Sequence, residues 1–442
     1  MSASEAIKTK LLNSISLKLL VILFLVIIMQ IPLSLVSDLI NERQSLLYVA
    51  QKSISDRWGE QQHIGTPLIK IKLQASQSKE DKALINYHTI QSDQANFEAD
   101  LQAEKRYLGI YEAAIYVTKL KLTGQIKVDS DVYYGGNEEV SVQLFIPFKH
   151  LRGLKNIDKI MINGQEVTDL PKKQQSNQMM GFAIDLQRKD IMKPLTYQIH
   201  LSVAGSQQFD ILPLAKSTTV TMQSNWNSPS FVGDYLPDER AITEKGFNAK
   251  WHINQLNNDS HSSSRFLTDQ QYSSFGVKIM IPANVYQVNV RTVKYSFLVI
   301  VLTFAGFFLT ELFFKLSLHP FQYLLIGFSL STFYLLLLSL SEYLSFNWSF
   351  LISASAIVGL ISGYCSVVLQ QTKRGLLTGI LFSILYGFIF ILVKAEEASL
   401  LMGSIAILLI LATVMYLTRK IDWYAAGTSN NTVISEKAIK SE

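Results

Sequence analysis

Six long apolar stretches constrain this chain more than any other feature of its sequence. One covers residues 19–36, and five follow one another at 295–314, 320–341, 348–369, 376–393 and 399–417. A helix of roughly 20 apolar residues crosses the ~30 Å hydrocarbon core of a bilayer. The sequence therefore predicts six membrane-spanning helices, the first of them separated from the other five by residues 37–294.

The first apolar stretch could be either a membrane anchor or a secretory signal peptide. Lys8, Lys10 and Lys18 precede it, and a basic segment followed by an apolar one is typical of both. However, Ser34-Leu-Val-Ser37 is a poor cleavage site, and the stretch is longer than the roughly 7–15 apolar residues of a signal core. We expect an uncleaved anchor at residues 19–36.

The distribution of basic residues predicts the orientation of the six helices. If residues 1–18 are cytoplasmic, alternating spans leave the tail 418–442 cytoplasmic as well. Lysine and arginine then gather on the cytoplasmic side, as the positive-inside rule requires. These residues are Lys8, Lys10, Lys18, Lys315, Lys373, Arg374, Arg419, Lys420, Lys437 and Lys440. The small net charge of +5 is explained by topology and gives no reason to expect a nucleic-acid partner.

Residues 37–294 contain no stretch long enough to span a bilayer, and their pattern predicts a large, mainly antiparallel β domain on the outer side of the membrane. Apolar residues alternate with polar ones from Val140 to Ile146, which is typical of a half-buried strand. Asn163-Gly164 between two short β-like segments predicts a hairpin turn. The helical period of residues 39–58 predicts that the first membrane helix continues outward. Further strands are expected at 116–122, 182–186, 195–203, 218–223 and 277–281.

The segment Asn225–Pro237 is the candidate functional loop of this domain. Its distinctive residues are Asn225, Trp226, Pro229, Phe231, Gly233, Asp234, Tyr235 and Pro237. Loops of this composition form ligand sites in some proteins. A rigid turn explains the same residues, with the aromatic side chains packed into the core and Asp234 accepting backbone N–H groups. The polar segment 254–265, which includes His261, is expected to be a solvated loop and not a metal site.

Two carboxylates, Glu311 and Glu342, lie at the ends of predicted membrane helices. An ionisable side chain in a membrane helix can belong to a proton or ion path. Glu311 is four residues from Lys315, and Glu342 is at the predicted outer boundary, so solvated interfacial carboxylates are the simpler interpretation.

Small residues recur every fourth position in two of the predicted helices, at Ser355, Gly359 and Gly363 and again at Gly375 and Gly379. This spacing lets helix backbones approach, and the partner is either another helix of this chain or another subunit. We expect packing within the bundle, because five neighbouring helices are available there.

No motif in the chain predicts a reaction or a cofactor. A serine-nucleophile elbow, a His-Glu-x-x-His zinc motif, a phosphate loop and a dinucleotide fingerprint are all missing, and the seven histidines are scattered. The single cysteine, Cys365, lies in an apolar stretch, so an intrachain disulfide is not possible. We therefore expect no catalytic residue, no cofactor and no metal.

Several longer motifs resemble the CreD family of bacterial inner-membrane, or cell-envelope integrity, proteins. They are Gly65-Thr-Pro-Leu-Ile69, Arg106-Tyr-Leu-Gly-Ile-Tyr111 with Ala114-Ile-Tyr116, the segment Asn225–Pro237, His319–Gly327, Leu336–Glu342 and Thr418–Tyr424. Thr66 interrupts the usual Gly-Pro, and Tyr343 stands where the family pattern has histidine. The resemblance implies a role in envelope integrity and in tolerance of envelope stress and β-lactams, without implying a reaction.

The hypothesis from the sequence is a non-enzymatic scaffold in the bacterial inner membrane. Its β domain would contact a periplasmic protein or a cell-wall component, and its bundle would contact the lipid bilayer. Two alternatives stay open: an envelope enzyme centred on Asn225–Pro237, and a small-solute transporter that uses Glu311 and Glu342.

Overall fold

The computed structural model divides the chain into two compact units, which are described separately. The β unit comprises Leu46–Pro282, and the bundle unit comprises Met1–Ser45 together with Ala283–Glu442. The structure describes residues 15–74, 85–128, 138–169, 171–176, 179–256, 273–281, 285–314, 318–368, 371–395 and 398–419. Most of the polar segment 254–265, including His261, lies outside the described residues, as does Lys315.

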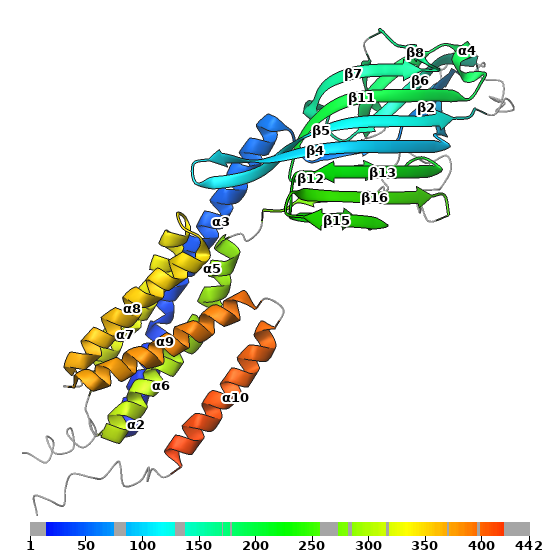
Figure 1. The fold of residues 1–442 in the computed structure, drawn as a ribbon. Helices are drawn as coiled ribbons and strands as arrows, with labels where there is room; N and C mark the ends of the chain where they lie inside the picture. Colours follow the sequence, from blue (N-terminus) through cyan, green and yellow to red (C-terminus); the bar gives the residue numbers. More distant parts are fainter. Residues whose placement is uncertain are drawn as a thin grey trace, which may run out of the picture. The chain divides into compact units, whose positions relative to one another are not determined.

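The bundle unit is built from helices, most of them long and apolar (Figure 1). They are α2 (Ile15–Ile28), α3 (Gln30–Trp58), α5 (Val285–Lys294), α6 (Ser296–Phe314), α7 (Pro320–Ser341), α8 (Phe346–Val368), α9 (Thr372–Lys394) and α10 (Ser399–Thr418). Of α3, the unit includes the first part. Five helical segments of the described chain are long and apolar enough to cross a membrane: Leu17–Trp58, Val285–Glu311, Pro320–Ser341, Phe346–Val368 and Thr372–Lys394. The apolar part of α10, Leu401–Tyr416, is shorter, so the sixth span stays a prediction.

The first apolar stretch continues into the polar helix that follows it, as the sequence predicts. The helix is interrupted only at Met29, between α2 and α3. Pro32 explains the interruption, because it has no N–H to donate to the carbonyl of Ile28, the last residue of α2. The boundary between the two units falls inside α3, between Ser45 and Leu46.

Helix α5 was not anticipated by the sequence, which extended the β region to residue 294. Tyr286, Asn289 and Thr292 recur at three-residue spacing and are buried on one face of α5. The contacts assign this helix to the bundle unit, where it packs against α7. The bundle therefore begins about one helix earlier in the chain than its first apolar span.

The β unit contains two large sheets. The strands of the first half of the unit are β1 (Gln62–Gly65), β2 (Leu68–Gln74), β3 (Ile85–Gln91), β4 (Gln94–Leu108), β5 (Tyr111–Ile126), β6 (Glu138–Phe148), β7 (Leu154–Ile162), β8 (Gln165–Glu166) and β9 (Lys172–Ser176). Those of the second half are β10 (Met179–Leu186), β11 (Leu195–Ser206), β12 (Gln208–Leu212), β13 (Ser217–Ser224), β14 (Pro229–Gly233), β15 (Glu239–Thr243), β16 (Gly246–Asn254) and β17 (Phe275–Ile279). Two single turns, η1 (Leu151–Gly153) and α4 (Arg188–Ile191), lie between strands.

The two sheets are mixed in strand direction. Sheet A has the order β14-β17-β12-β1-β6-β10-β9, with β2 pairing with β6 and β3, and sheet B has the order β15-β16-β13-β4-β5-β11-β7-β8. The pairs β1–β12 and β4–β13 are parallel, and the other pairs among the described strands are antiparallel. Parallel neighbouring strands are joined by long connections, so no short turn motif in the sequence predicts which strands pair in this way.

One apolar core joins the sheets. Inward residues of β4 and β5 in sheet B pack with inward residues of β1, β2 and β6 in sheet A. Aromatic rings from both sheets meet there, including Trp251 of β16 and Phe275 of β17, whose ring centroids are 5.5 Å apart. The predicted Asn163-Gly164 turn is present, and both residues have positive φ, at 52° and 79°.

The outer face of sheet A differs from the expectation of a half-buried strand. Phe145 points away from the shared core but is only 1% exposed, in a second cluster with Leu68, Ala183, Leu212 and Leu214. Simple alternation predicted a solvated position for Phe145, and this prediction was wrong. The reason is that both faces of β6 are covered, so alternation no longer separates buried from exposed residues.

Candidate functional sites

The segment Asn225–Pro237 makes contacts that are typical of a rigid turn. Trp226, Phe231 and Tyr235 pack against the shared core, and the Trp226 indole N–H donates to the Met280 carbonyl at 2.9 Å. The backbone N–H of Ser274 donates to Asp234 Oδ2 at 3.0 Å. The distinctive side chains of the loop thus have structural partners, and a ligand-binding role for them stays a prediction.

Pro229 and Gly233 set the ends of β14 within this segment. Pro229 is the first residue of β14, an edge strand of sheet A, where its missing N–H costs no ladder bond. Gly233 has a φ of 98°, and a side chain there would collide with the backbone of Ser274. Pro237 follows β14 and is half-buried. Each of these residue types is explained by backbone geometry alone.

Asn225 differs from the rest of the loop because it contacts another strand. Its side-chain amide accepts from the Ala103 N–H at 2.8 Å and donates to the Ala103 carbonyl at 3.1 Å. Ser224, the last residue of β13, pairs with Leu101 of β4 in the parallel ladder. Asn225 therefore extends this ladder along β4 after the backbone pairing has ended.

Strands β4 and β5 form a hairpin that extends beyond the neighbouring strands of sheet B. β13 pairs with β4 only as far as Leu101, and β11 pairs with β5 only from Ile115 onward. Residues 105–114 therefore form a two-stranded ribbon, and Figure 1 shows the β4–β5 hairpin extending beyond its neighbours. Gly109 at its turn has a φ of 63°. An isolated two-stranded hairpin is only marginally stable, so this ribbon depends on the contacts at its base.

The tip of this ribbon carries exposed apolar side chains. Tyr107 is 65% exposed, Leu108 is 44% exposed and Ile110 is 41% exposed. All three belong to the motif Arg106–Tyr111, which the sequence analysis noted only for its family resemblance. Apolar residues gathered on a projecting element are typical of an interaction site.

A buried polar pair lies on the outer face of sheet A, and the sequence did not predict it. His63 of β1 is opposite Asp210 of β12 in the parallel ladder, and His63 Nδ1 lies 3.3 Å from Asp210 Oδ2. Gln208 Nε2 donates to the same oxygen at 2.7 Å. Asp210 Oδ1 and His63 Nε2 are buried and have no hydrogen-bond partner among the described residues.

Burial shifts the two pKa values of this pair in opposite directions. Removal of water raises the pKa of Asp210 from 3.8 to about 6, although the Gln208 hydrogen bond and the positive charge of Lys149 oppose the rise. Burial lowers the pKa of His63 from 6.5 to about 4, and Lys149 and His150 add to this effect. Near pH 7 the pair therefore consists of a neutral imidazole beside a carboxylate.

Lys70 is a second buried ionisable group on the same face. It is 2% exposed, and its amino group lies 3.4 Å from the centroid of the Phe145 ring. Its Nζ has no hydrogen-bond partner in the part of the chain that the structure describes. Burial lowers its pKa from 10.5 to about 8. The attraction to the ring offsets part of the cost of burying the charge. Within the described residues, no group of three or more His, Cys, Asp or Glu side chains could hold a metal ion.

In the bundle unit, Glu311 is buried and paired. Its side chain is 7% exposed, and Oε1 accepts from Lys18 Nζ at 2.6 Å and from the Leu318 N–H at 3.1 Å. The Tyr323 hydroxyl donates to Oε2 at 3.2 Å. Glu311 is therefore not the solvated carboxylate that the sequence predicted, because its side chain is buried and paired with a lysine of the N-terminal helix.

Glu342 also pairs with the N-terminal helix. Arg43 Nε of α3 lies 3.5 Å from Glu342 Oε1, and the Glu342 side chain is 11% exposed. One residue earlier, the hydroxyl of Ser341 accepts from Asn289 Nδ2 of α5 at 2.7 Å. Both candidate carboxylates thus hold α2 and α3 to the bundle, and they lie near opposite ends of α7.

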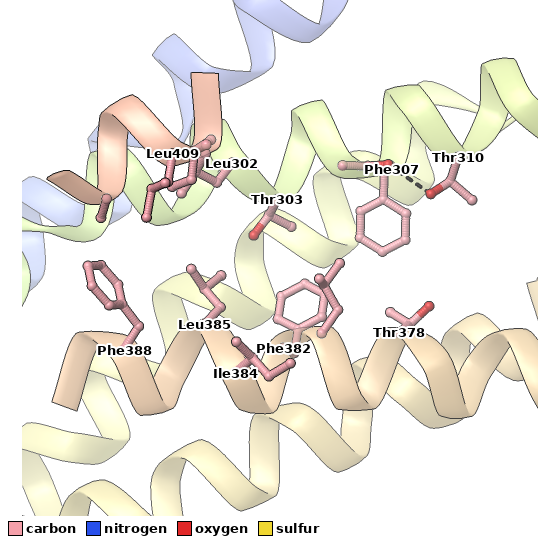
Figure 2. Close-up of a pocket in the computed structure, with 14 residues that line it drawn as sticks. Leu302, Thr303, Phe307, Thr310, Thr378, Phe382, Ile384, Leu385, Phe388 and Leu409 are labelled. Atoms are coloured by element: carbon pink, nitrogen blue, oxygen red, sulfur yellow. Dashed lines mark hydrogen bonds between the residues drawn. The ribbon is translucent and has the colours of Figure 1, made fainter. Parts of the chain in front are cut away.

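Two grooves lie among the described helices of the bundle. The first is apolar, has a volume of about 440 Å³ and is lined by residues of α6, α9 and α10 (Figure 2). Thr303 lines it and has a buried hydroxyl without a hydrogen-bond partner, whereas the Thr310 hydroxyl donates to the Gly306 carbonyl at 2.8 Å. The second groove, of about 910 Å³, lies between α8 and α9 and includes Lys394.

The two sets of small residues behave differently. Gly375 and Gly379 are buried in the contact between α9 and α8, and a Cβ at Gly375 would lie 2.5 Å from the Cβ of Ser366. This packing within the bundle is as predicted. Gly359 and Gly363 instead are exposed and have open space where a side chain would be. Intrachain packing was the wrong prediction for these two residues.

Comparison with known proteins identifies the family. The family model described as "Inner membrane protein CreD" matches residues 14–424. The chain is also 30% identical to the Inner membrane protein CreD of Escherichia coli (strain K12), over 90% of this chain and 92% of that protein. The chain belongs to the CreD family of inner membrane proteins. As a CreD family member with several apolar helices, it is a multi-pass inner-membrane protein in contact with the lipid bilayer.

Solved structures add little to this identification. Two structures of an M1 zinc metallopeptidase from Deinococcus radiodurans resemble the chain with TM-scores of 0.21 and 0.22, each at 9% identity. They cover 37% and 46% of this chain and 38% and 52% of the metallopeptidase chains. TM-scores this low do not establish a shared fold, so the CreD family assignment rests on sequence.

The sequence could have revealed some of the missed residues. Asp210 stands between Phe209 and Ile211 in a short apolar run, which is an unusual place for a carboxylate. Its partner His63 could not be found, because the two strands are parallel and far apart in the chain. Two residues of the second groove lie at the ends of apolar stretches: Trp348 begins one stretch, and Lys394 follows another. Tryptophan and lysine are common at these positions, so neither residue stood out in the sequence.

Proposed function

We propose that this CreD family protein is a non-enzymatic scaffold that supports cell-envelope integrity and binds a partner on the periplasmic side through its β4–β5 hairpin. Both termini are cytoplasmic in this proposal, and the β unit is periplasmic. The partner is a periplasmic protein or a cell-wall component. The observation that carries the proposal is the exposed apolar tip at Tyr107, Leu108 and Ile110.

The ribbon that bears the tip is held in place at its base. Asn225 makes two hydrogen bonds to the backbone of Ala103, and Gln51 Nε2 of α3 donates to the Glu112 carbonyl at 3.1 Å. The Trp58 indole N–H donates to the Tyr116 carbonyl at 3.2 Å. A braced ribbon presents its tip in a defined position, which reduces the conformational entropy lost on binding.

The charges near the tip are mutually neutralised. Lys105 Nζ lies 2.9 Å from Glu112 Oε2, and Arg106 Nε lies 3.0 Å from Glu104 Oε1. These exposed ion pairs contribute little stability, but they leave the ribbon without a strong net charge. The apolar side chains are therefore the main source of affinity in this proposal, and binding should depend only weakly on salt.

The ion pairs of the bundle support a scaffold over a transporter. Lys18–Glu311 and Arg43–Glu342 each join the N-terminal helix to the bundle. A carboxylate held in this way stabilises one arrangement of helices, whereas an ion path needs groups that can exchange partners. We assign both carboxylates to holding the anchor helix.

Photocrosslinking in living cells tests the proposal. A photoreactive phenylalanine analogue is placed at Tyr107 in the full-length protein, and the same analogue at Met192 provides the control. Met192 is 76% exposed on the β unit but lies outside the hairpin. We expect a discrete crosslinked product from position 107 and none from position 192.

The phenotype provides the second readout. We expect the double variant Tyr107→Ser, Leu108→Ser to lose β-lactam tolerance and the product crosslinked from position 110, while Met192→Ser retains both. The proposal is refuted if position 107 gives no discrete product under β-lactam stress, or if the double variant, present at normal levels, keeps full tolerance.

A further inference from the structure

The groove between α8 and α9 has a composition that changes along its length. At one end are Asn347 and Trp348 at the beginning of α8 and Lys394 at the end of α9. Beyond them the lining is apolar or small, and it includes Leu351, Ala354, Ser355, Val358, Gly359, Ser383, Gly387 and Phe390. The groove is therefore amphipathic from end to end.

The polar end of the groove lies at the level where a lipid headgroup begins. Trp348 is 62% exposed, and exposed tryptophan in membrane helices concentrates at the boundary between hydrocarbon and water. Asn347 and Trp348 also follow the short α7–α8 connection that contains Glu342, the partner of Arg43. Lysine at a helix end likewise extends toward this boundary.

Among the described residues, no carboxylate pairs with the positive charge that Lys394 supplies at this end; Glu396 and Glu397, which follow it in the sequence, lie outside the described residues. Its side chain is exposed, and its amino group lies 5.0 Å from the centroid of the Phe390 ring. The described residues place no carboxylate within ion-pairing distance of it, in contrast to Lys18 and Arg43. An anion would complement this charge.

The length of the groove matches one leaflet. From Asn347 to Gly359 the helix rises about 18 Å at 1.5 Å per residue, slightly more than half of a ~30 Å hydrocarbon core. The volume of about 910 Å³ is accessible because Gly359 and Gly387 have open space where side chains would be. An extended hydrocarbon chain fits this shape.

We propose that the α8–α9 groove is a binding site for an anionic phospholipid, whose acyl chain lies along Gly359 and Gly387 and whose phosphate is held by Lys394. The lipid comes from the leaflet on the side of the α7–α8 connection. This site is independent of the hairpin, because all of its residues belong to the bundle unit. Its failure would leave the proposed role of the hairpin unaffected.

Native mass spectrometry of the full-length protein tests the site. The protein is reconstituted with equal amounts of phosphatidylglycerol and phosphatidylcholine of the same chain length, and the lipids retained on release are counted. We expect about a fivefold preference for phosphatidylglycerol, the effect of one lysine near an anionic headgroup. Lys394→Gln should reduce this preference to about one without changing helix packing.

Two glycine variants of α8 separate the groove from general effects on the helix. Gly359→Leu fills the groove, whereas Gly363→Leu adds the same side chain one turn further along, at an exposed position outside the groove. We expect Gly359→Leu to lose the retained lipid and Gly363→Leu to keep it. Circular dichroism verifies that both variants are folded.

The site is refuted if Gly359→Leu and Gly363→Leu retain phosphatidylglycerol equally, or if Lys394→Gln keeps the wild-type preference. Retention of both lipids in equal amounts by the wild-type protein would also refute it, because the groove would then be occupied by whichever lipid surrounds the protein. The Lys394→Gln result decides the matter if Gly359→Leu fails to fold.

Discussion

The His63–Asp210 pair should give the β unit two opposing responses to pH, which single substitutions will separate. The pKa of Asp210 is raised to about 6, so the folded protein binds a proton below pH 6 that the unfolded chain binds only near 3.8. Folding is therefore favoured as the pH falls. The pKa of His63 is lowered to about 4, so the unfolded chain binds a proton below 6.5 that the folded protein excludes. This effect opposes folding as the pH falls.

The size of each response follows from these pKa values. In His63→Gln only the Asp210 response remains, and the opening free energy of the site should rise by about 1.3 kcal/mol between pH 7 and pH 5. In Asp210→Asn only the His63 response remains, and the same quantity should fall by about 2 kcal/mol. In the wild-type protein the two responses nearly cancel, and the opening free energy should fall by only about 0.5 kcal/mol between pH 7 and pH 5.

Hydrogen exchange of the full-length protein in nanodiscs measures these changes. Peptides covering Gln62–Gly65 and Phe209–Leu212 report on the two paired strands, and rates are corrected for the intrinsic effect of pH. We expect exchange about tenfold slower at pH 5 than at pH 7 in His63→Gln, and faster in Asp210→Asn. His88→Gln, at an exposed histidine of sheet A, is the matched control. Identical pH dependence in all three variants would refute the reasoning.

Three further predictions concern the buried charges and the hairpin. Lys70→Met should raise the free energy of unfolding of the β unit at pH 7 by on the order of 1–3 kcal/mol. It should also abolish the rise in stability that the wild-type protein shows between pH 8 and 10.5, and pulse proteolysis measures both effects. Asn225→Ala should cost about 1–2 kcal/mol and increase exchange at Ala103 and along the ribbon, without altering β16. Lys18→Met should lower the melting temperature of the bundle, because it leaves Glu311 buried and unpaired, and Lys18→Met with Glu311→Gln should recover part of the loss in a double-mutant cycle.

Periodicity and turn chemistry were sufficient for the local elements. The apolar stretches predicted α6, α7, α8 and α9 to within a few residues, because the length of a membrane helix is set by the bilayer. The Asn163-Gly164 turn was predictable because few residue pairs tolerate two positive φ angles. Both signals are local, and they do not depend on which distant segments meet.

Pairing between distant segments was not predictable. The parallel pairs β1–β12 and β4–β13 determine where His63 meets Asp210 and where Asn225 meets Ala103, and neither pair is joined by a turn. Alternation also failed at Phe145, since the outer face of sheet A is buried as well. The segment Asn225–Pro237 stood out in the sequence, but its contact through Asn225 with the β4–β5 hairpin became visible only when the strand register was known.

Glu311 and Glu342 lie at helix ends, as the sequence predicted, but they are paired and largely buried and not solvated. Glu311 and Glu342 were placed at helix ends from the sequence, and each was compared only with residues near it in the chain. Their partners, Lys18 and Arg43, are 25 positions apart on the N-terminal helix, which corresponds to about 38 Å of helical rise. This distance exceeds the ~30 Å hydrocarbon core, so the helix is long enough to place each ion pair near an interface. An anchor held at both ends is fixed in depth as well as in position. In the proposed scaffold, that requirement explains why two carboxylates accompany two basic residues at this spacing.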